Sequence, residues 1–175
     1  KELISIRKET LGLFDLDTAV SLNNLSVVYT AMSVSHFQKS LDLIKEVVKI
    51  KTQILGKFHP STIRSVSNMA VTYWKLKEYD TALSNLEMVL EFRTQVFGMN
   101  HPDTILSLNN LGVFYWRTGN YEKGEEYLSL MIQLREKVLG ERHFQTLNTC
   151  GSLGRLYIEI EEFLMGEMLL KRVVD

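Results

Sequence analysis

Three histidines at equal spacing are the residues whose type and arrangement most suggest chemistry in this chain. His59, His101 and His143 are each 42 residues apart, and imidazole is a common metal ligand. Each lies in a loop between predicted helices, and successive helical repeats are offset by about 10 Å. Three imidazoles at that separation cannot share one zinc ion, whose ligand bonds are about 2 Å long. We therefore expect these side chains to pack in loops, and we expect no metal site.

The other reactive side chains do not form a catalytic set either. Cys150 occupies the predicted buried face of a helix that holds no nearby histidine to activate its thiol. The acidic run EIEEF at 159–163 spans a helix end and a turn, so it offers no carboxylate pair with separated environments. The segment LGKFHPST lacks the residue order of a phosphate-binding loop. These features predict neither an enzyme nor a bound cofactor.

The composition is that of a globular protein, with 45% hydrophobic and 23% charged residues among 175. A net charge of -1 argues against a broad basic face for nucleic acid. No apolar run reaches the roughly 18 residues of a membrane span. A single cysteine gives no sign of an oxidising compartment. We expect a cytoplasmic protein that binds neither nucleic acid nor membrane.

A repeated phrase shows how the chain is organised. The segment GKFHPSTIRSVSNMAVTYW at 56–74 returns as GMNHPDTILSLNNLGVFYW at 98–116, which is 42 residues later. An earlier copy carries two extra residues between Tyr29 and Phe37, and we expect them to lengthen one turn. The residues that recur in three later copies are Gly56, Gly98 and Gly140, then Thr62, Thr104 and Thr146, then Tyr73, Tyr115 and Tyr157.

Each copy is predicted to form two helices. Apolar residues recur at helical spacing, so we expect helices at about 103–118 and 121–138, joined by a turn at 118–120. Proline suits the first turn of a helix and glycine suits its end, as at Pro102 and Gly140. Small residues recur where paired helices must approach closely: Ser26, Ala70, Gly112 and Gly154 on the first helix, and Ser40, Ala82, Gly124 and Gly166 on the second.

One such pair cannot bury its own apolar face, so neighbouring pairs must stack into an array. We expect an all-α fold, a right-handed superhelical solenoid of antiparallel helix pairs forming one continuous domain. Its predicted divisions are the end of a preceding repeat at 1–11 and repeats at 12–55, 56–97, 98–139 and 140–175. Both ends interrupt a repeat, and the exposed apolar faces there are expected to favour self-association.

The repeat resembles the tetratricopeptide motif, Trp-x2-Leu-Gly-x2-Tyr followed by Ala-x3-Phe. Here Leu108, Leu111, Gly112 and Tyr115 occupy the first part, with leucine in place of tryptophan, and Gly124-x3-Leu then replaces Ala-x3-Phe. The period of 42 exceeds the family's 34 by about two helical turns. Together with HPDT, LNNL and REKVLG, that longer period is similar to the repeats of kinesin light chains and of some signalling ATPases.

The resemblance implies that an extended peptide binds on a concave face lined by the first helix of each repeat. The residues it places on that face are Asn23, Asn24, Val27, Thr30, Ala31, Arg64, Asn68, Val71, Trp74, Lys75, Asn109, Asn110, Val113, Trp116, Arg117, Asn148 and Arg155. Their asparagine amides could bond a peptide backbone, although they could equally bond neighbouring repeats. Trp74 and Trp116 are candidate anchors, with packing between helices as the alternative.

Charge on the same face predicts an acidic ligand. Four cations stand there against one acid, Glu159, so an acidic peptide would be attracted, unless these charges have partners within the chain. The cations are Arg64, Lys75, Arg117 and Arg155. The leading hypothesis is a protein–protein interaction module of a larger scaffold, adaptor or signalling protein that binds an acidic and apolar segment. The alternative is a structural array that holds its own parent protein inactive or assembles it.

Overall fold

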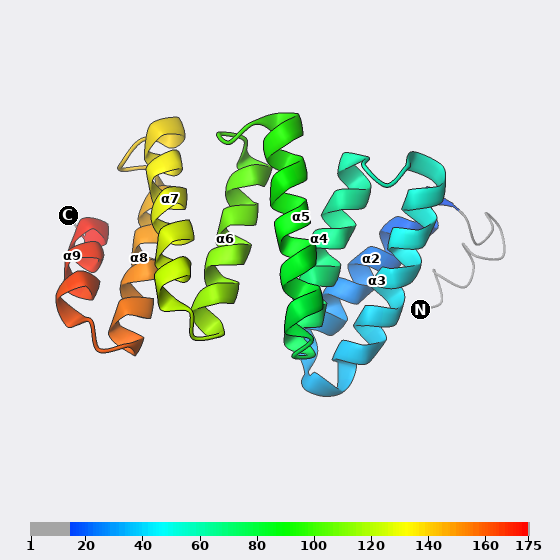
Figure 1. The fold of residues 1–175 in the computed structure, drawn as a ribbon, viewed down its shortest axis with the longest axis horizontal. Coiled ribbons are helices and arrows are strands. Elements are labelled where there is room, and N and C mark those ends of the chain that lie inside the picture. Colours follow the sequence, from blue (N-terminus) through cyan, green and yellow to red (C-terminus); the bar gives the residue numbers. More distant parts are fainter. Residues whose placement is uncertain (1–14, 175) are drawn as a thin grey trace. The chain divides into compact units, whose positions relative to one another are not determined.

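The computed structural model describes residues 15–174, which form eight α-helices and no strand (Figure 1). The helices are α2 (Leu16–Met32), α3 (Val34–Leu55), α4 (Pro60–Lys75), α5 (Tyr79–Phe97), α6 (Pro102–Arg117), α7 (Tyr121–Leu139), α8 (Phe144–Glu159) and α9 (Phe163–Val174). The predicted all-α class is confirmed, and α6 and α7 match the helices expected at 103–118 and 121–138. The helix end expected at 1–11 lies outside the described residues.

The chain divides into two compact units, with the division between Phe92 and Arg93 within α5. In the N-terminal unit, α3 packs against both α2 and α4. In the C-terminal unit, α6 pairs with α7, α8 pairs with α9, and α7 also contacts α8. A central core cluster of the N-terminal unit comprises Ala19, Leu22, Leu41, Ile44, Val47 and Ile50. The repeat divisions themselves stay predictions.

The turn between α2 and α3 corrects one expectation. The two extra residues between Tyr29 and Phe37 do not lengthen a turn, because α2 continues to Met32 and α3 already begins at Val34. Only Ser33 separates the two helices, in an extended conformation with φ -144° and ψ 163°. This segment lacks the glycine that ends the corresponding helix of the third repeat, so the added residues continue the helices.

The three recurring histidines are helix N-caps. Nδ1 of His59 accepts a hydrogen bond from the backbone N–H of Ser61 at 3.1 Å, and His101 and His143 repeat this contact at the starts of α6 and α8. A cap of this kind satisfies one of the helix's first four N–H groups, which have no partner inside the helix. The expected role in the loops is therefore confirmed and made specific.

Small residues bring the paired helices of the C-terminal unit close together. A Cβ atom added to Gly124 on α7 would lie 2.9 Å from the backbone nitrogen of Trp116 on α6. One added to Gly166 on α9 would lie 2.9 Å from the carbonyl oxygen of Gly154 on α8. Because backbone atoms cannot move aside as flexible side chains can, alanine is too large at Gly124 and Gly166.

The N-terminal unit makes the same close approach with serines. The hydroxyl of Ser40 on α3 donates to the carbonyl oxygen of Ser26 on α2 at 2.7 Å, and both residues are buried. The Ser40 hydroxyl also lies 2.6 Å from that of Thr30. The predicted small-residue contacts are thus present in both units, with hydrogen-bonded serines in one and glycines in the other.

A basic residue in every second helix joins one repeat to the next, a feature that the sequence reading missed. The Lys51 ammonium on α3 donates to the Ser61 carbonyl at 3.3 Å and to the Ser65 hydroxyl at 2.9 Å. Arg93 and Arg135, spaced 42 residues further on, make the corresponding contacts in the C-terminal unit. Each cation therefore ties its helix to the first turns of the following one.

Replacing Gly124 by alanine should destabilise the chain, although alanine normally favours a helix. The forced contact with the backbone of α6 should lower the free energy of unfolding by about 1–3 kcal/mol. Gly151 is the matched control, because a Cβ there would meet its nearest neighbour, Val173, at 3.6 Å. Gly151→Ala should therefore raise stability by up to about 1 kcal/mol. Thermal unfolding followed by circular dichroism measures both, and equal melting temperatures for the two variants would contradict this packing.

Lys51 should make stability depend on pH. Its side chain is 3% exposed, and burial, followed by the nearby charge of Arg64, lowers the pKa of its ammonium group from the usual 10.5. Between the lowered pKa and 10.5 the unfolded chain holds more protons than the folded one, so stability should rise with pH there. Lys51→Arg supplies the control, because arginine keeps its charge. Urea unfolding from pH 7 to that limit should show the wild type gaining on the variant, whereas parallel curves would refute the assignment.

Candidate functional site

A hollow in the N-terminal unit lies between α2 and α4, the first helices of two successive repeats. Its volume is about 220 Å³. Six of its eight lining residues are among those expected on the ligand-binding face. The lining comprises Ser26, Val27, Thr30, Ala31, Asn68, Val71, Thr72 and Lys75. Residues that the repeat pattern assigns to one face thus lie together around one hollow.

The hollow has apolar and polar parts. Val27 and Val71 contribute its exposed or half-exposed branched side chains, one from each helix. The hydroxyls of Thr30 and Thr72 lie 3.2 Å apart and connect the two helices. Ser26 and Thr72 were missed in the sequence, although Thr72 is 42 residues after Thr30 and could have been found from that spacing. The site can therefore surround a small apolar group with hydroxyl groups beside it.

Lys75 stands at the end of α4 and lines the same hollow. Its ammonium donates to the carbonyl oxygen of Thr30 at 2.7 Å, in the last turn of α2. A cation is favourable there because a helix C-terminus carries partial negative charge. The ammonium also lies 5.3 Å from the ring centre of Phe37, within the range of a cation–π contact. These contacts hold an exposed positive charge at the hollow.

Two of the predicted asparagines are brought together. The Asn68 amide donates to the Asn23 side-chain oxygen at 3.3 Å, which joins α4 to α2. Bonding between repeats, one of the two roles left open by the sequence, is thus present for this pair. Asn24 and Asn148 are exposed, whereas Asn109 and Asn110 are half-buried. Each amide of the Asn23–Asn68 pair still has further donor or acceptor capacity for a ligand backbone.

Trp116 corrects the expectation of an aromatic anchor on the binding face. Its side chain is 3% exposed, and its ring meets those of Tyr121 and Tyr157 edge-on at 5.3 and 5.6 Å between centres. Long side chains on a helix lean toward its N-terminus and pack on neighbouring turns, so helical spacing alone did not determine the direction of this ring. Packing between helices, the alternative from the sequence, therefore describes Trp116, while Trp74 is half-buried.

The cations of the C-terminal unit are partly neutralised, which corrects the predicted charge excess. The Arg117 guanidinium donates to both carboxylate oxygens of Glu159, at 2.8 and 3.4 Å, across 42 residues. Arg155 is exposed and donates to the Ser152 hydroxyl at 3.2 Å. Arg64 is exposed in the N-terminal unit, and Val113 is half-buried in the C-terminal one. The alternative of intrachain partners therefore holds for Arg117.

Within residues 15–174, no three histidine, cysteine or carboxylate side chains gather as a metal site would require. Cys150 is a free, buried thiol, and burial raises its pKa, which disfavours the reactive thiolate. None of the helices in this range is both long enough and apolar enough to cross a membrane.

The family model of the tetratricopeptide repeat matches residues 34–95, 62–121 and 103–175, which together span most of the sequence. The chain therefore belongs to the tetratricopeptide repeat family, whose repeats are non-enzymatic scaffolds for protein–protein interaction. No curated protein sequence gave a significant match.

Solved structures share this fold. The TPR-like repeats of a Podosopora anserina protein provisionally named a kinesin light chain align with a TM-score of 0.77 and 24% identity, over 91% of this chain and 75% of that one. A glutamine-to-methionine variant of those repeats gives 0.74 and 25%, over 88% and 72%. BtubC (BKLC) from P. vanneervenii gives 0.75 and 17%, over 91% and 63%. The fold is thus a helical solenoid similar to kinesin light chain repeats.

Trp116→Ala should lower the free energy of unfolding by about 3–5 kcal/mol, because it removes a buried ring that packs against two tyrosines. The neighbouring Arg117→Ala loses only an exposed ion pair and should cost about 1 kcal/mol or less. Chemical denaturation of the two variants gives both values. If the Trp116 variant were as stable as the Arg117 variant, the ring would not have the packing role assigned to it.

Proposed function

We propose that this chain binds an extended segment of a partner protein, and that an apolar side chain of this segment enters the hollow between α2 and α4. The observation that carries the proposal is the hollow itself, because most of its lining comes from positions that the repeat pattern predicts for the binding face. A volume of about 220 Å³ suits one side chain rather than a drug-sized molecule, for which pockets begin near about 300 Å³.

The chemistry of the lining supports a ligand with apolar and acidic residues. Val27 and Val71 would remove an aliphatic or aromatic side chain from water, which favours binding. Lys75 lies beside them, and its ammonium would attract a carboxylate next to that side chain. The half-buried Asn68 can offer its remaining donor and acceptor to the peptide backbone.

The N-terminal unit supports the acidic preference better than the C-terminal unit does. Arg64 and Lys75 lie on the same helix, α4, and both are exposed. Arg117, in contrast, already pairs with Glu159. An acidic ligand would therefore gain more from the cations on α4 than from Arg117, whose carboxylate partner it would have to displace.

Val27→Asp should weaken binding of peptides enriched from a displayed library by about tenfold or more, because it places a carboxylate in the hollow. Val28→Asp is the matched control. The two valines are neighbours on α2 and are 47% and 53% exposed, but only Val27 lines the hollow. Fluorescence anisotropy with the enriched peptides measures both affinities, and Lys75→Gln should reduce the preference for acidic peptides.

Equal losses in the Val27 and Val28 variants would contradict the site. A library that enriches no peptide would contradict the proposal itself and would favour the array acting within its own parent protein. Circular dichroism of each variant separates these outcomes from loss of fold.

A further inference from the structure

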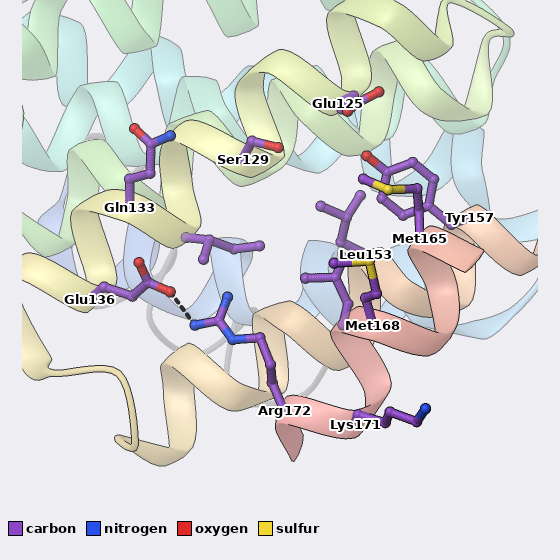
Figure 2. Close-up of a pocket in the computed structure, with 12 residues that line it drawn as sticks. Glu125, Ser129, Gln133, Glu136, Leu153, Tyr157, Met165, Met168, Lys171 and Arg172 are labelled. Carbon is purple, nitrogen blue, oxygen red and sulfur yellow. Dashed lines mark hydrogen bonds and ion pairs between the residues drawn. The ribbon is translucent and has the colours of Figure 1, made fainter. Parts of the chain in front are cut away.

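A second hollow lies in the C-terminal unit between α7 and α9, with α8 beneath it (Figure 2). Its volume is about 530 Å³, which is larger than that of the hollow between α2 and α4. Its apolar lining comprises Ile132 on α7, Leu153 and Tyr157 on α8, and Met165, Met168 and Leu169 on α9. An ion pair between Glu136 and Arg172 bridges α7 and α9 at one side of the hollow. The hollow is therefore formed by different helices from the proposed peptide site.

The preceding repeat shows how the equivalent tyrosine is covered when the chain supplies the partners itself. Tyr115 on α6 stacks with Tyr127 on α7, with ring centres 5.7 Å apart and planes 7° apart. The ammonium of Lys123 lies 5.0 Å from the centre of the Tyr115 ring. A tyrosine of this repeat position thus receives a second ring and a cation, both from the following helix.

Tyr157 is the residue 42 positions after Tyr115, but it receives neither of these groups from the equivalent positions. Met165 replaces the lysine and Leu169 replaces the stacking tyrosine, so both the cation and the ring are lost. Both replacement residues line the hollow beside Tyr157. The hollow therefore contains the place where the preceding repeat positions an aromatic ring and a basic group.

Charge around Tyr157 favours a cation at that place. Burial raises the pKa of the Tyr157 hydroxyl above its usual range, and the carboxylate of Glu125 and the charge of Glu162 raise it further. Glu125 also lines the hollow and lies in Figure 2 on α7, across from Tyr157. A lysine or arginine brought to this side would gain the attraction of two carboxylates, as it would not beside Lys75.

We propose that the hollow between α7 and α9 binds an aromatic side chain adjacent to a basic residue in a partner protein. The ring stacks on Tyr157 as Tyr127 stacks on Tyr115, and the basic group lies near Glu125. Met165 and Met168 add flexible thioethers, which make favourable contacts with aromatic rings and adapt to their shape. This charge preference is opposite to that of the hollow between α2 and α4, so one chain would hold two different segments.

Three labelled peptides test the ligand chemistry. Each is an octapeptide of serine and glycine with a central Tyr-Lys, Leu-Lys or Tyr-Glu pair. The Tyr-Lys peptide should bind and shift the methyl NMR signals of Met165 and Met168 through the ring current of its tyrosine. The other two should bind about tenfold more weakly, because each lacks one of the two groups. Absence of methyl shifts at millimolar Tyr-Lys peptide, or equal binding of all three peptides, overturns the proposal.

Two sets of variants test the location. Met165→Lys combined with Leu169→Tyr restores the arrangement of the preceding repeat, so the chain should fill its own hollow and lose Tyr-Lys binding without a lower melting temperature. Glu125→Gln should weaken binding several-fold, whereas Glu126→Gln, an exposed neighbour that does not line the hollow, should not. Undiminished binding by the double variant, or equal effects of the two glutamine variants, overturns the assignment. Val27→Asp should leave Tyr-Lys binding unchanged, which distinguishes this site from the other.

Discussion

The close approach of the two helices in each repeat is the constraint on which the other features depend. It requires a very small residue on both helices at one level, and the C-terminal unit meets this requirement with glycines whose missing Cβ atoms would collide with the opposite backbone. Ser26 and Ser40 meet it in the N-terminal unit through a hydrogen bond. Because the contact is between backbones, it determines how far apart the helices lie, and the larger side chains must then pack on either side of it.

Side chains around this contact determine which surfaces remain open. Where a repeat supplies a large ring, as Tyr127 does beside Tyr115, the space between helices is filled by the chain itself. Where it supplies a smaller side chain, as at Val27 or Leu169, a hollow remains. The two hollows differ in charge, with Lys75 at one and Glu125 at the other. A regular scaffold can thus present different binding chemistry through substitutions that leave the helix contacts unchanged.

The features that could be predicted from the sequence are those determined locally or by the repeat. Helix bounds, the glycine pairs and the grouping of Val27 with Val71 follow from spacing, since equivalent positions share one environment. The direction of a side chain at a helix end does not follow from spacing, which is why the burial of Trp116 was missed. The ion pair of Arg117 with Glu159 and the hydrogen bonds of Lys51 depend on contacts between repeats. Their regular 42-residue spacing was nevertheless present in the sequence.

The central claim is that the hollow between α2 and α4 holds the apolar side chain of an acidic peptide. A crystal structure of the chain with a library-selected peptide tests it most directly. The account predicts an apolar side chain of the peptide between Val27 and Val71, with a carboxylate beside the Lys75 ammonium. A peptide bound elsewhere on the chain, with the hollow between α2 and α4 left empty, would contradict it.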